Sequence, residues 1–344
     1  MKKLWLHIVQ IYLQVAFLFY YKKITACYQA PISLDKPVLF LSNHQNALLD
    51  PLLITIKSKR KNYFLTRASV FKNKLAAKLF KSLQMLPVYR VRDGFSNLSK
   101  NHQIFSICAE VLHNDKSIIL FPEGSHSLNR SVRNLSKGFT RIIDETLSRY
   151  PNTDIQIIPV GLNFQHPKDW ADSVSVYFGK PIFISNYLSE NKTVKVKQLK
   201  EKVKQEIAKL TTHIEPGEQY TTTEKKLTKM QVDYTKPEAV NQCLTNGFKY
   251  KHKTVLPASP LFKAFSVGVK IIFWLPYLVW RGAVLPKIKE DEFIGTFRFA
   301  VILTLAPIFL IIQSVAIGYL FSPSTGILFF TFALLLAWLT PKLR

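Results

Sequence analysis

Residues 43–51 read Asn-His-Gln-Asn-Ala-Leu-Leu-Asp-Pro and follow a short apolar run at 38–41. The length and polar borders of that run predict a buried strand, and the apolar residues after Pro51 predict a helix. Asp50 is then the expected N-cap, with Pro51 at the first helical position. If the connecting loop curls back, the imidazole of His44 meets the carboxylate of Asp50. A carboxylate in contact with an imidazole can orient it to act as a general base. A loop histidine beside a capping carboxylate is the plainer interpretation, and this stretch alone leaves both open.

Three further blocks accompany this stretch. Residues 117–121 form a second strand-like run and lead into Pro-Glu-Gly-Ser-His-Ser at 122–127. A third run includes Ile-Pro-Val-Gly at 158–161, and Leu-Pro-Val-Tyr-Arg stands at 86–90. In this order and separation the four blocks resemble the motifs of the glycerophospholipid acyltransferase family. The resemblance covers roughly residues 36–185.

The resemblance implies a reaction and two catalytic residues. In this family a histidine deprotonates a lipid hydroxyl, which attacks an acyl thioester directly, and an aspartate keeps the imidazole in the correct tautomer. Carried over, His44 is the base and Asp50 its orienting partner. The family uses acyl-CoA or acyl-acyl-carrier protein as co-substrate, and we expect no further cofactor and no metal.

The resemblance also implies an acceptor site. Arg90 matches the arginine that holds the acceptor's phosphate, a task for which a guanidinium fork is well suited. The block that begins at Glu123 matches the acceptor-binding block, and residues 159–161 are expected to shape the site. The predicted acceptor-binding residues are Arg90, Arg92, Glu123, Gly124, Ser125, His126 and Lys137.

Two departures from the family pattern affect the acceptor. Five residues separate His44 from Asp50, where many members have four. His126 stands where an arginine is common, so the positive charge would come from Arg130, Arg133 or Lys137. The reaction class is unaffected, but the identity of the acceptor is left open.

Composition favours a membrane partner. The chain has 344 residues, with 47 Lys and Arg against 22 Asp and Glu, for a formal net charge of +25. Such an excess suits an anionic membrane face or nucleic acid. A hydrophobic content of 48%, with 25 Phe, favours the membrane, and no nucleic-acid-binding motif is present. Three scattered cysteines form neither a disulfide framework nor a metal-ligand pattern.

The middle of the chain alternates strand-like and helix-like segments. This alternation predicts an α/β domain at 36–211, with a largely parallel central sheet flanked by helices. His44, Glu123 and Gly161 are each expected to follow a strand at one edge, where ligands bind. Strands are predicted at 38–41, 62–66, 86–90, 117–121, 155–160, 174–178 and 181–184, and helices at 52–58, 72–83, 95–113, 135–149 and 194–210.

The two ends of the chain predict membrane contact. Residues 4–21 are apolar with one narrow polar stripe, which predicts a helix that lies in the membrane interface or packs on its own domain, within an N-terminal segment at 1–35. A signal peptide is the competing interpretation, disfavoured because Lys22 and Lys23 interrupt the apolar run. Residues 212–260 are polar and predict a linker or a loosely packed region. In the C-terminal region 261–344, a transmembrane hairpin is expected at 299–340, and 261–285 is expected to be interfacial or re-entrant.

Together these features predict a membrane-bound acyltransferase of phospholipid biosynthesis that acylates 1-acylglycerol 3-phosphate. Its expected partners are membrane phospholipids and the acyl donor, with no nucleic acid. Basic residues on both sides of the hairpin place its ends, and the active site, on the cytoplasmic face of the inner membrane. Glycerol 3-phosphate, a lysophospholipid or an aminolipid are alternative acceptors. A non-catalytic lipid-binding protein, a serine hydrolase acting through Ser125 and a metal site are the other classes considered.

Overall fold

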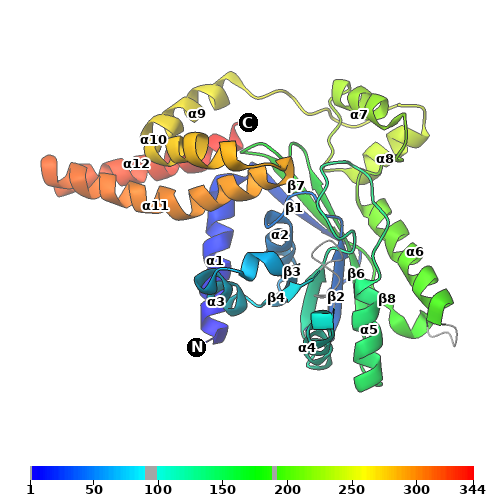
Figure 1. The fold of residues 1–344 in the computed structure, drawn as a ribbon. Helices are drawn as coiled ribbons and strands as arrows, with labels where there is room; N and C mark the ends of the chain where they lie inside the picture. The colour runs from blue at the N-terminus through cyan, green and yellow to red at the C-terminus, as the bar shows by residue number, and fades with distance from the viewer. Residues whose placement is uncertain (1, 90–98, 188–191) are drawn as a thin grey trace.

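A mostly parallel β-sheet lies at the centre of the protein, in a computed structural model that describes residues 2–89, 99–187 and 192–344 (Figure 1). Within this described part the sheet order is β1-β7-β6-β2-β5-β3-β4, and β8 also pairs with β6. The strands are β1 (Lys23–Tyr28), β2 (Val38–Ser42), β3 (Asn62–Arg67), β4 (Met85–Val88), β5 (Ser117–Leu120), β6 (Gln156–Phe164), β7 (Ser173–Phe178) and β8 (Ile182–Phe183).

The strand β2 lies between β5 and β6 and is parallel to both. Leu41 pairs with Leu120 of β5, and Ser42 pairs with Val160 of β6. Pairs of β6 with β7 and β8 are antiparallel, whereas the other strand pairs are parallel. The loops that follow β2 and β5 therefore leave the same edge of the sheet, as the sequence predicts. Gly161 was also expected to follow a strand at this edge, but it lies inside β6.

The helices cover both faces of the sheet. Alternate residues of β2 point to opposite faces because a strand has a two-residue repeat. Leu39 and Leu41 join the core under α4, α5 and α6, whereas Val38 and Phe40 join a second core under α1 and α2. The predicted α/β architecture is confirmed. These helices are α1 (Lys2–Tyr20), α2 (Leu49–Ser58), α3 (Lys74–Ser82), α4 (Asn101–His113), α5 (Gly138–Arg149) and α6 (Lys192–Leu210).

Gly161 has a packing role. It lies against the end of α6, where a Cβ atom would come within 2.1 Å of the Leu210 carbonyl oxygen. Only a glycine lets the helix approach the sheet this closely. The glycine that was expected to shape the ligand edge therefore sets the spacing between β6 and α6.

Two segments differ from what the sequence suggested. Residues 23–28, for which no strand was predicted, form the edge strand β1 beside β7. Residues 212–260 were predicted as a linker or a loosely packed region, but they contain α7 (Tyr220–Lys229) and α8 (Pro237–Thr245) around a small core of their own. Leu227 and Val240 are fully buried there, since a few well-spaced apolar residues suffice to hold two short helices together. The overall division of the chain into domains stays a prediction.

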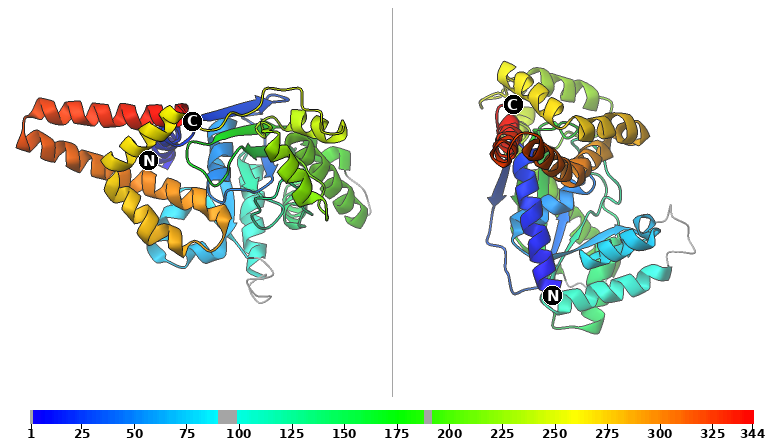
Figure 2. Two further views of the ribbon diagram at one scale, coloured as in Figure 1. Left: turned by 90° about the horizontal axis from the view of Figure 1, so that it is seen from above. Right: turned by 90° about the vertical axis from the view of Figure 1, so that its left-hand side faces the viewer.

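The C-terminal region forms a long helical hairpin. It consists of α11 (Ile294–Leu320) and α12 (Pro323–Lys342), 27 and 20 residues long. Figure 2 shows these helices projecting together from the rest of the protein. Near the tip a Cβ on Gly326 would lie 2.5 Å from the Ser314 carbonyl oxygen, so the helices pack closely there. Within the described residues, three helices are long and apolar enough to cross a membrane: α1, α11 and α12.

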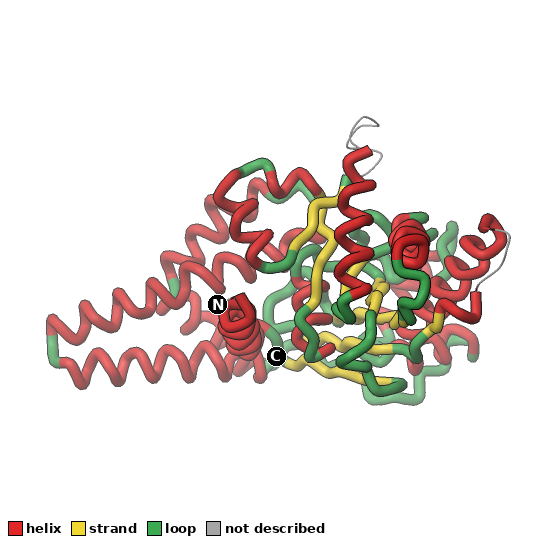
Figure 3. The backbone as a smooth tube through the Cα atoms, turned by 90° about the horizontal axis from the view of Figure 1, so that it is seen from below, coloured by secondary structure: helices red, strands yellow, loops and turns green. Residues whose placement is uncertain are grey.

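The helix α1 crosses the direction of this hairpin. In Figure 3 the hairpin runs across the view while α1 is seen nearly end-on, and Figure 1 shows α1 at a steep angle to both hairpin helices. Before the hairpin, α9 (Pro260–Ile272) and the segment that begins with α10 (Trp274–Leu278) are bent by 100° relative to each other. Such a bend fits either a broken span or a re-entrant loop.

Candidate active site

The loop after β2 brings His44 and Asp50 together. The Nδ1 atom of His44 lies 2.7 Å from Oδ2 of Asp50, whose side chain is fully buried. The same Oδ2 accepts hydrogen bonds from the backbone amides of Gln45 and Asn46, at 2.7 and 2.8 Å. The loop reverses at Ala47, which has a φ of 38°. The two side chains meet because this reversal brings the start of α2 back over the loop.

The expected N-cap role of Asp50 is wrong. The helix α2 begins at Leu49, so Asp50 and Pro51 lie in its first turn. Proline is tolerated in a first turn because the amide it lacks has no partner within the helix. From that turn the carboxylate of Asp50 points back to the loop amides, and it stabilises the loop rather than the helix end.

Asn43 fixes the position of this loop on the sheet. Its Nδ2 donates to the Leu162 carbonyl at 2.9 Å, and its Oδ1 accepts from the Leu162 amide at 2.8 Å. Both bonds attach the residue before His44 to β6, which carries the family's fourth block. The sequence placed Asn43 in the motif without a role. The signal in the sequence that could have indicated this role is that Asn43 directly precedes His44.

Aromatic rings enclose the imidazole of His44. The Phe121 ring is stacked on it, with ring centroids 3.8 Å apart and an angle of 11°. The His126 ring lies 4.2 Å from it at 56°, and the Phe293 ring meets His126 edge-on at 4.9 Å. The side chain of His44 is 12% exposed. The residue that replaces the family's usual arginine, His126, is therefore in direct contact with the predicted base.

Burial keeps the imidazole neutral. Removal from solvent lowers the pKa of His44 well below its usual 6.5, and the positive charge of Arg133 lowers it further. Burial also raises the pKa of the Asp50 carboxyl, while the amides of Asn46 and Gln45 counteract that shift. With Nδ1 donating to Asp50, the Nε2 atom of a neutral His44 carries the lone pair. A neutral ring in this tautomer is what a general base needs.

Arg133 organises the block that follows β5. Its Nε and Nη2 atoms donate to Oε2 of Glu123 at 2.9 and 2.7 Å, and its Nη1 donates to the Ser125 hydroxyl at 2.7 Å. Its Nη2 also donates to the Ser125 carbonyl. Burial raises the pKa of Glu123, and the adjacent guanidinium counteracts this. Four of the five N–H groups of Arg133 are thus engaged by residues of the described chain.

The other predicted acceptor-binding residues occupy different positions. Gly124 is exposed in the turn after β5, with a φ of 75° that favours glycine. Lys137 is exposed just before α5 and does not line either cavity described below. Arg90 and Arg92 lie outside the described residues. The strand that precedes them, β4, is parallel to β3 and reaches the same edge of the sheet as β2.

Arg130 is not available as a phosphate ligand. Its guanidinium is buried and donates to the carbonyls of Phe164 and Gln165, at 3.0 and 3.1 Å. It also lies 3.5 Å from the centre of the Tyr234 ring. Arg130 therefore links β6 to the small core of α7 and α8. Its expected role as a replacement for the missing arginine is wrong.

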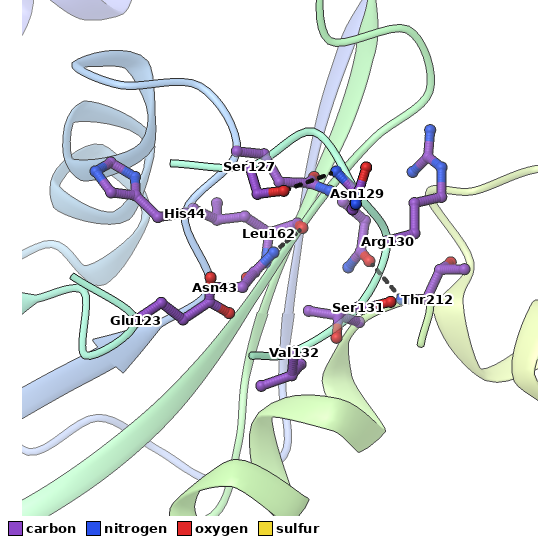
Figure 4. Close-up of a pocket in the computed structure, with 13 residues that line it drawn as sticks. Asn43, His44, Glu123, Ser127, Asn129, Arg130, Ser131, Val132, Leu162 and Thr212 are labelled. Atoms are coloured by element: carbon purple, nitrogen blue, oxygen red, sulfur yellow. Dashed lines mark hydrogen bonds between the residues drawn. The ribbon is translucent and has the colours of Figure 1, made fainter. Parts of the chain in front are cut away.

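The imidazole ring of His44 does not point into either of the two cavities nearby (Figure 4). Figure 4 shows a polar cavity beside Asn43, Glu123 and Asn129, with the ring of His44 pointing away from it. Its volume of about 10 Å³ suits a single water molecule. A larger cleft of about 490 Å³ lies beyond Arg130, between residues 165–169 and α7. In the described residues, no three His, Cys, Asp or Glu side chains are grouped so as to hold a metal.

Comparison with known proteins assigns the family of this region. Residues 23–163, which run from β1 almost to the end of β6, match the family model named Acyltransferase. This segment belongs to the acyltransferase family, which confirms the family predicted from the four sequence blocks. It contains His44, Asp50 and the block that begins at Glu123.

Individual relatives match short stretches. An uncharacterized acyltransferase of Schizosaccharomyces pombe is 34% identical over 67 residues, 20% of this chain and 10% of that protein. Glycerol-3-phosphate O-acyltransferase 1 of Saccharomyces cerevisiae is 29% identical over 87 residues, 25% of this chain and 11% of that protein. The chain thus spans about a tenth of the length of either relative.

Similar chains are also found among solved structures. One of them is the crystal structure of the 1-acyl-sn-glycerophosphate (LPA) acyltransferase PlsC from Thermotoga maritima. The sequences are 18% identical and the TM-score is 0.44, over 62% of this chain and 83% of that chain.

The lowered pKa of His44 leads to a test of its environment. Diethyl pyrocarbonate modifies neutral imidazoles, so the pH dependence of His44 modification, followed by peptide mass spectrometry, reports its pKa. We expect half-maximal modification below pH 6.5. In Arg133→Gln the midpoint should rise, because loss of the positive charge makes protonation easier. A wild-type midpoint at or above 6.5 would contradict this description of the site.

Proposed function

We propose that this protein is a membrane-bound O-acyltransferase. It transfers a fatty acyl group from an acyl thioester to the hydroxyl of 1-acylglycerol 3-phosphate in phospholipid biosynthesis. The observation that carries this proposal is the 2.7 Å contact between His44 and Asp50, inside the segment that matches the acyltransferase family. A non-catalytic lipid-binding protein would not need a buried carboxylate that orients a neutral imidazole.

The proposed reaction needs no protein nucleophile. The Nε2 atom of His44 accepts the proton of the acceptor hydroxyl as the oxygen attacks the thioester carbonyl. The new C–O bond forms, the C–S bond breaks, and the proton passes from the imidazolium to the departing thiolate. Asp50 holds the tautomer and stabilises the transient imidazolium, as the aspartate of a serine-protease triad does. A base positioned in this way contributes about 10²–10⁴-fold in rate.

The acceptor's phosphate is assigned to Arg90 and Arg92. Arg130 is buried against backbone carbonyls, and Arg133 is largely engaged by Glu123 and Ser125. The family resemblance therefore supports Arg90 as the main phosphate ligand, because its guanidinium can bind a dianionic phosphate through two parallel hydrogen bonds. His126, next to His44, is expected to contact the acceptor near its reacting hydroxyl.

A lipid acceptor is favoured over a soluble one by the position of the site. Thr296, in the first turn of α11, hydrogen-bonds the loop that carries His44 and Asp50. An acceptor dissolved in the bilayer would therefore reach His44 from the membrane surface. This supports 1-acylglycerol 3-phosphate over glycerol 3-phosphate, and a lysophospholipid or an aminolipid is the alternative. The acyl donor is acyl-CoA or acyl-acyl-carrier protein, both anionic and suited to the net charge of +25.

Membrane association follows from the apolar helices, and we propose a particular placement. The hairpin of α11 and α12 spans the inner membrane, and the rest of the chain lies on the cytoplasmic face. Lys287 and Lys289 before the hairpin and Arg344 after it support this orientation. Because α1 crosses the hairpin direction steeply, it would lie along the membrane surface, although its length alone would allow it to span (Figure 1).

The catalytic proposal is tested by substitutions in the pair. We expect His44→Ala to reduce acyl transfer to lysophosphatidate by at least about 100-fold. Asp50→Asn should also be severely impaired, and the double variant should lose little more than His44→Ala, because the two residues act as a unit. Activity is measured with radiolabelled acyl-CoA, and melting temperatures check that the variants fold.

A Ser125→Ala variant tests the alternative of a serine nucleophile, and it should retain substantial activity. The Ser125 hydroxyl accepts from Arg133, but the proposed mechanism assigns it no bond to the acyl group. No acylated Ser125 should be trapped in the wild type by rapid quenching and mass spectrometry. Near-normal turnover by His44→Ala, or an acyl-Ser125 intermediate, would contradict the mechanism.

A panel of acceptors tests the phosphate assignment. We expect lysophosphatidate to be acylated faster than glycerol 3-phosphate, lysophosphatidylethanolamine or a hydroxylated aminolipid. Arg90→Ala should raise KM for lysophosphatidate about tenfold or more, with little effect on KM for the acyl donor, because it removes a charged phosphate contact. Arg149→Ala, which removes an arginine at the C-terminal end of α5, is the control. Faster acylation of an aminolipid would refute the assignment and leave the reaction class intact.

The membrane placement is tested by cysteine labelling of the full chain. With Cys27, Cys108 and Cys243 replaced by serine, a Ser324→Cys variant carries its thiol at the hairpin tip. A membrane-impermeant maleimide should label it from outside the inner membrane, whereas a Lys61→Cys variant should react only after lysis. The wild type should stay with membranes after alkaline washing, because two apolar helices hold it. Labelling of Lys61→Cys in intact spheroplasts would show the reverse orientation.

A further inference from the structure

The hairpin makes a specific contact with the turn of the catalytic loop. The Thr296 hydroxyl, in the first turn of α11, donates to the Asn46 carbonyl at 3.2 Å and accepts from the Leu48 amide at 3.0 Å. These two groups belong to the peptide units on either side of Ala47. A single hydroxyl from 250 residues away therefore bonds both peptides that flank the reversal of the loop.

Ala47 is the residue in this loop that most needs such support. Its φ of 38° lies in the left-handed region, which a residue with a Cβ adopts at a cost in energy. A conformation of this kind persists where the surroundings over-determine it. The Asn46 carbonyl also accepts from the Leu49 amide at 2.9 Å, and the Asn46 side chain donates to the Pro167 carbonyl at 2.8 Å. Thr296 bonds the backbone of the turn itself, at the two peptide units that flank Ala47.

The same turn sets the position of the Asp50 carboxylate. The amide of Asn46 donates to Oδ2 of Asp50, the oxygen that contacts Nδ1 of His44. Thr296 bonds the carbonyl of Asn46, and Asp50 accepts from its amide. A change in the turn at Ala47 would therefore alter the angle at which the carboxylate meets the imidazole.

The base of α11 is held firmly against this loop. A Cβ on Gly295 would lie 2.6 Å from Oδ1 of Asn46, so the helix backbone is in close contact with the loop. The Tyr20 hydroxyl donates to the Gly295 carbonyl at 3.0 Å, and Arg298 donates to that hydroxyl and to the Lys168 carbonyl. Helix α1 and the loop after β6 thus fix the turn that carries Thr296.

We propose that Thr296 is a positioning residue, whose hydroxyl holds the turn at Ala47 in the conformation that aligns Asp50 with His44. Through it the membrane hairpin becomes part of the catalytic apparatus. This inference rests on the proposed acyl transfer for its kinetic consequences. Its structural part, the dependence of the His44 environment on Thr296, stands without it.

The test compares two substitutions of nearly equal size. Thr296→Val keeps the shape of the side chain and removes both hydrogen bonds, whereas Thr296→Ser keeps the hydroxyl. We expect kcat for lysophosphatidate acylation to fall about tenfold or more in Thr296→Val, with KM for the acyl donor nearly unchanged, and to recover largely in Thr296→Ser. Thr304→Val is the control, because the Thr304 hydroxyl bonds the Ala300 carbonyl of its own helix.

A second change separates positioning from general structural damage. Ala47→Gly relieves the strain at the turn, since glycine adopts positive φ readily. Added to Thr296→Val, it should restore part of kcat. Because relief of strain also stabilises the folded protein, kcat is compared per folded protein, with the melting temperature of each variant measured alongside. Equal kcat in Thr296→Val and wild type, or no gain from Ala47→Gly in the impaired variant, would overturn the proposal.

A readout independent of acyl transfer distinguishes the two proposals. The pH dependence of His44 modification by diethyl pyrocarbonate should shift in Thr296→Val and return to the wild-type curve in Thr296→Ser. If the wild type acylates no lipid in the panel but this shift is present, the proposed function fails and the positioning role holds. If the protein is an active acyltransferase and the curves coincide, the positioning role fails alone.

Discussion

One carboxylate oxygen, Oδ2 of Asp50, is the point on which the site depends. It lies 2.7 Å from His44 and accepts from two consecutive loop amides, and the Asp50 side chain is fully buried. Hydrogen bonds to a charged group are strong, and a buried charge is tolerated only when it has such partners. The loop is therefore folded around the carboxylate, and the carboxylate is kept in place by the loop. Asn43 attaches this unit to β6, and Thr296 attaches it to the C-terminal helical hairpin.

The elements that the sequence predicted are those with local causes. Short apolar runs bordered by polar residues became buried strands, and β2 has each of its five residues buried. The strand β1 was missed because its residues are half-buried at the sheet edge and show no continuous apolar run. The start of α2 was misplaced because Asp-Pro suggested a boundary, whereas a proline fits within a first turn. The small core of α7 and α8 was missed because few apolar residues form it.

The site was predictable in its residue types and less so in its contacts. The meeting of His44 with Asp50 required a loop reversal, which is made by an alanine with positive φ, a residue that gives no such signal in a sequence. Arg130 and Arg133 are three residues apart and looked equivalent in the sequence. Arg130 donates to the backbone carbonyls of Phe164 and Gln165 at the end of β6, whereas Arg133 donates to the Glu123 carboxylate. Thr296 acts on a loop 250 residues away. Contacts set by the tertiary fold leave no local pattern.

On the proposed placement of the hairpin, the unequal lengths of α11 and α12 determine the depth of the site relative to the bilayer. At 1.5 Å per residue, the 20 residues of α12 extend about 30 Å, the thickness of a hydrocarbon core. The 27 residues of α11 extend about 40 Å, so roughly 10 Å of it stands above that core. The surplus is the part that carries Thr296 and contacts the catalytic loop. On the proposed placement, His44 lies at the level of the lipid headgroups, so an acceptor could present its hydroxyl while its acyl chain stays in the membrane.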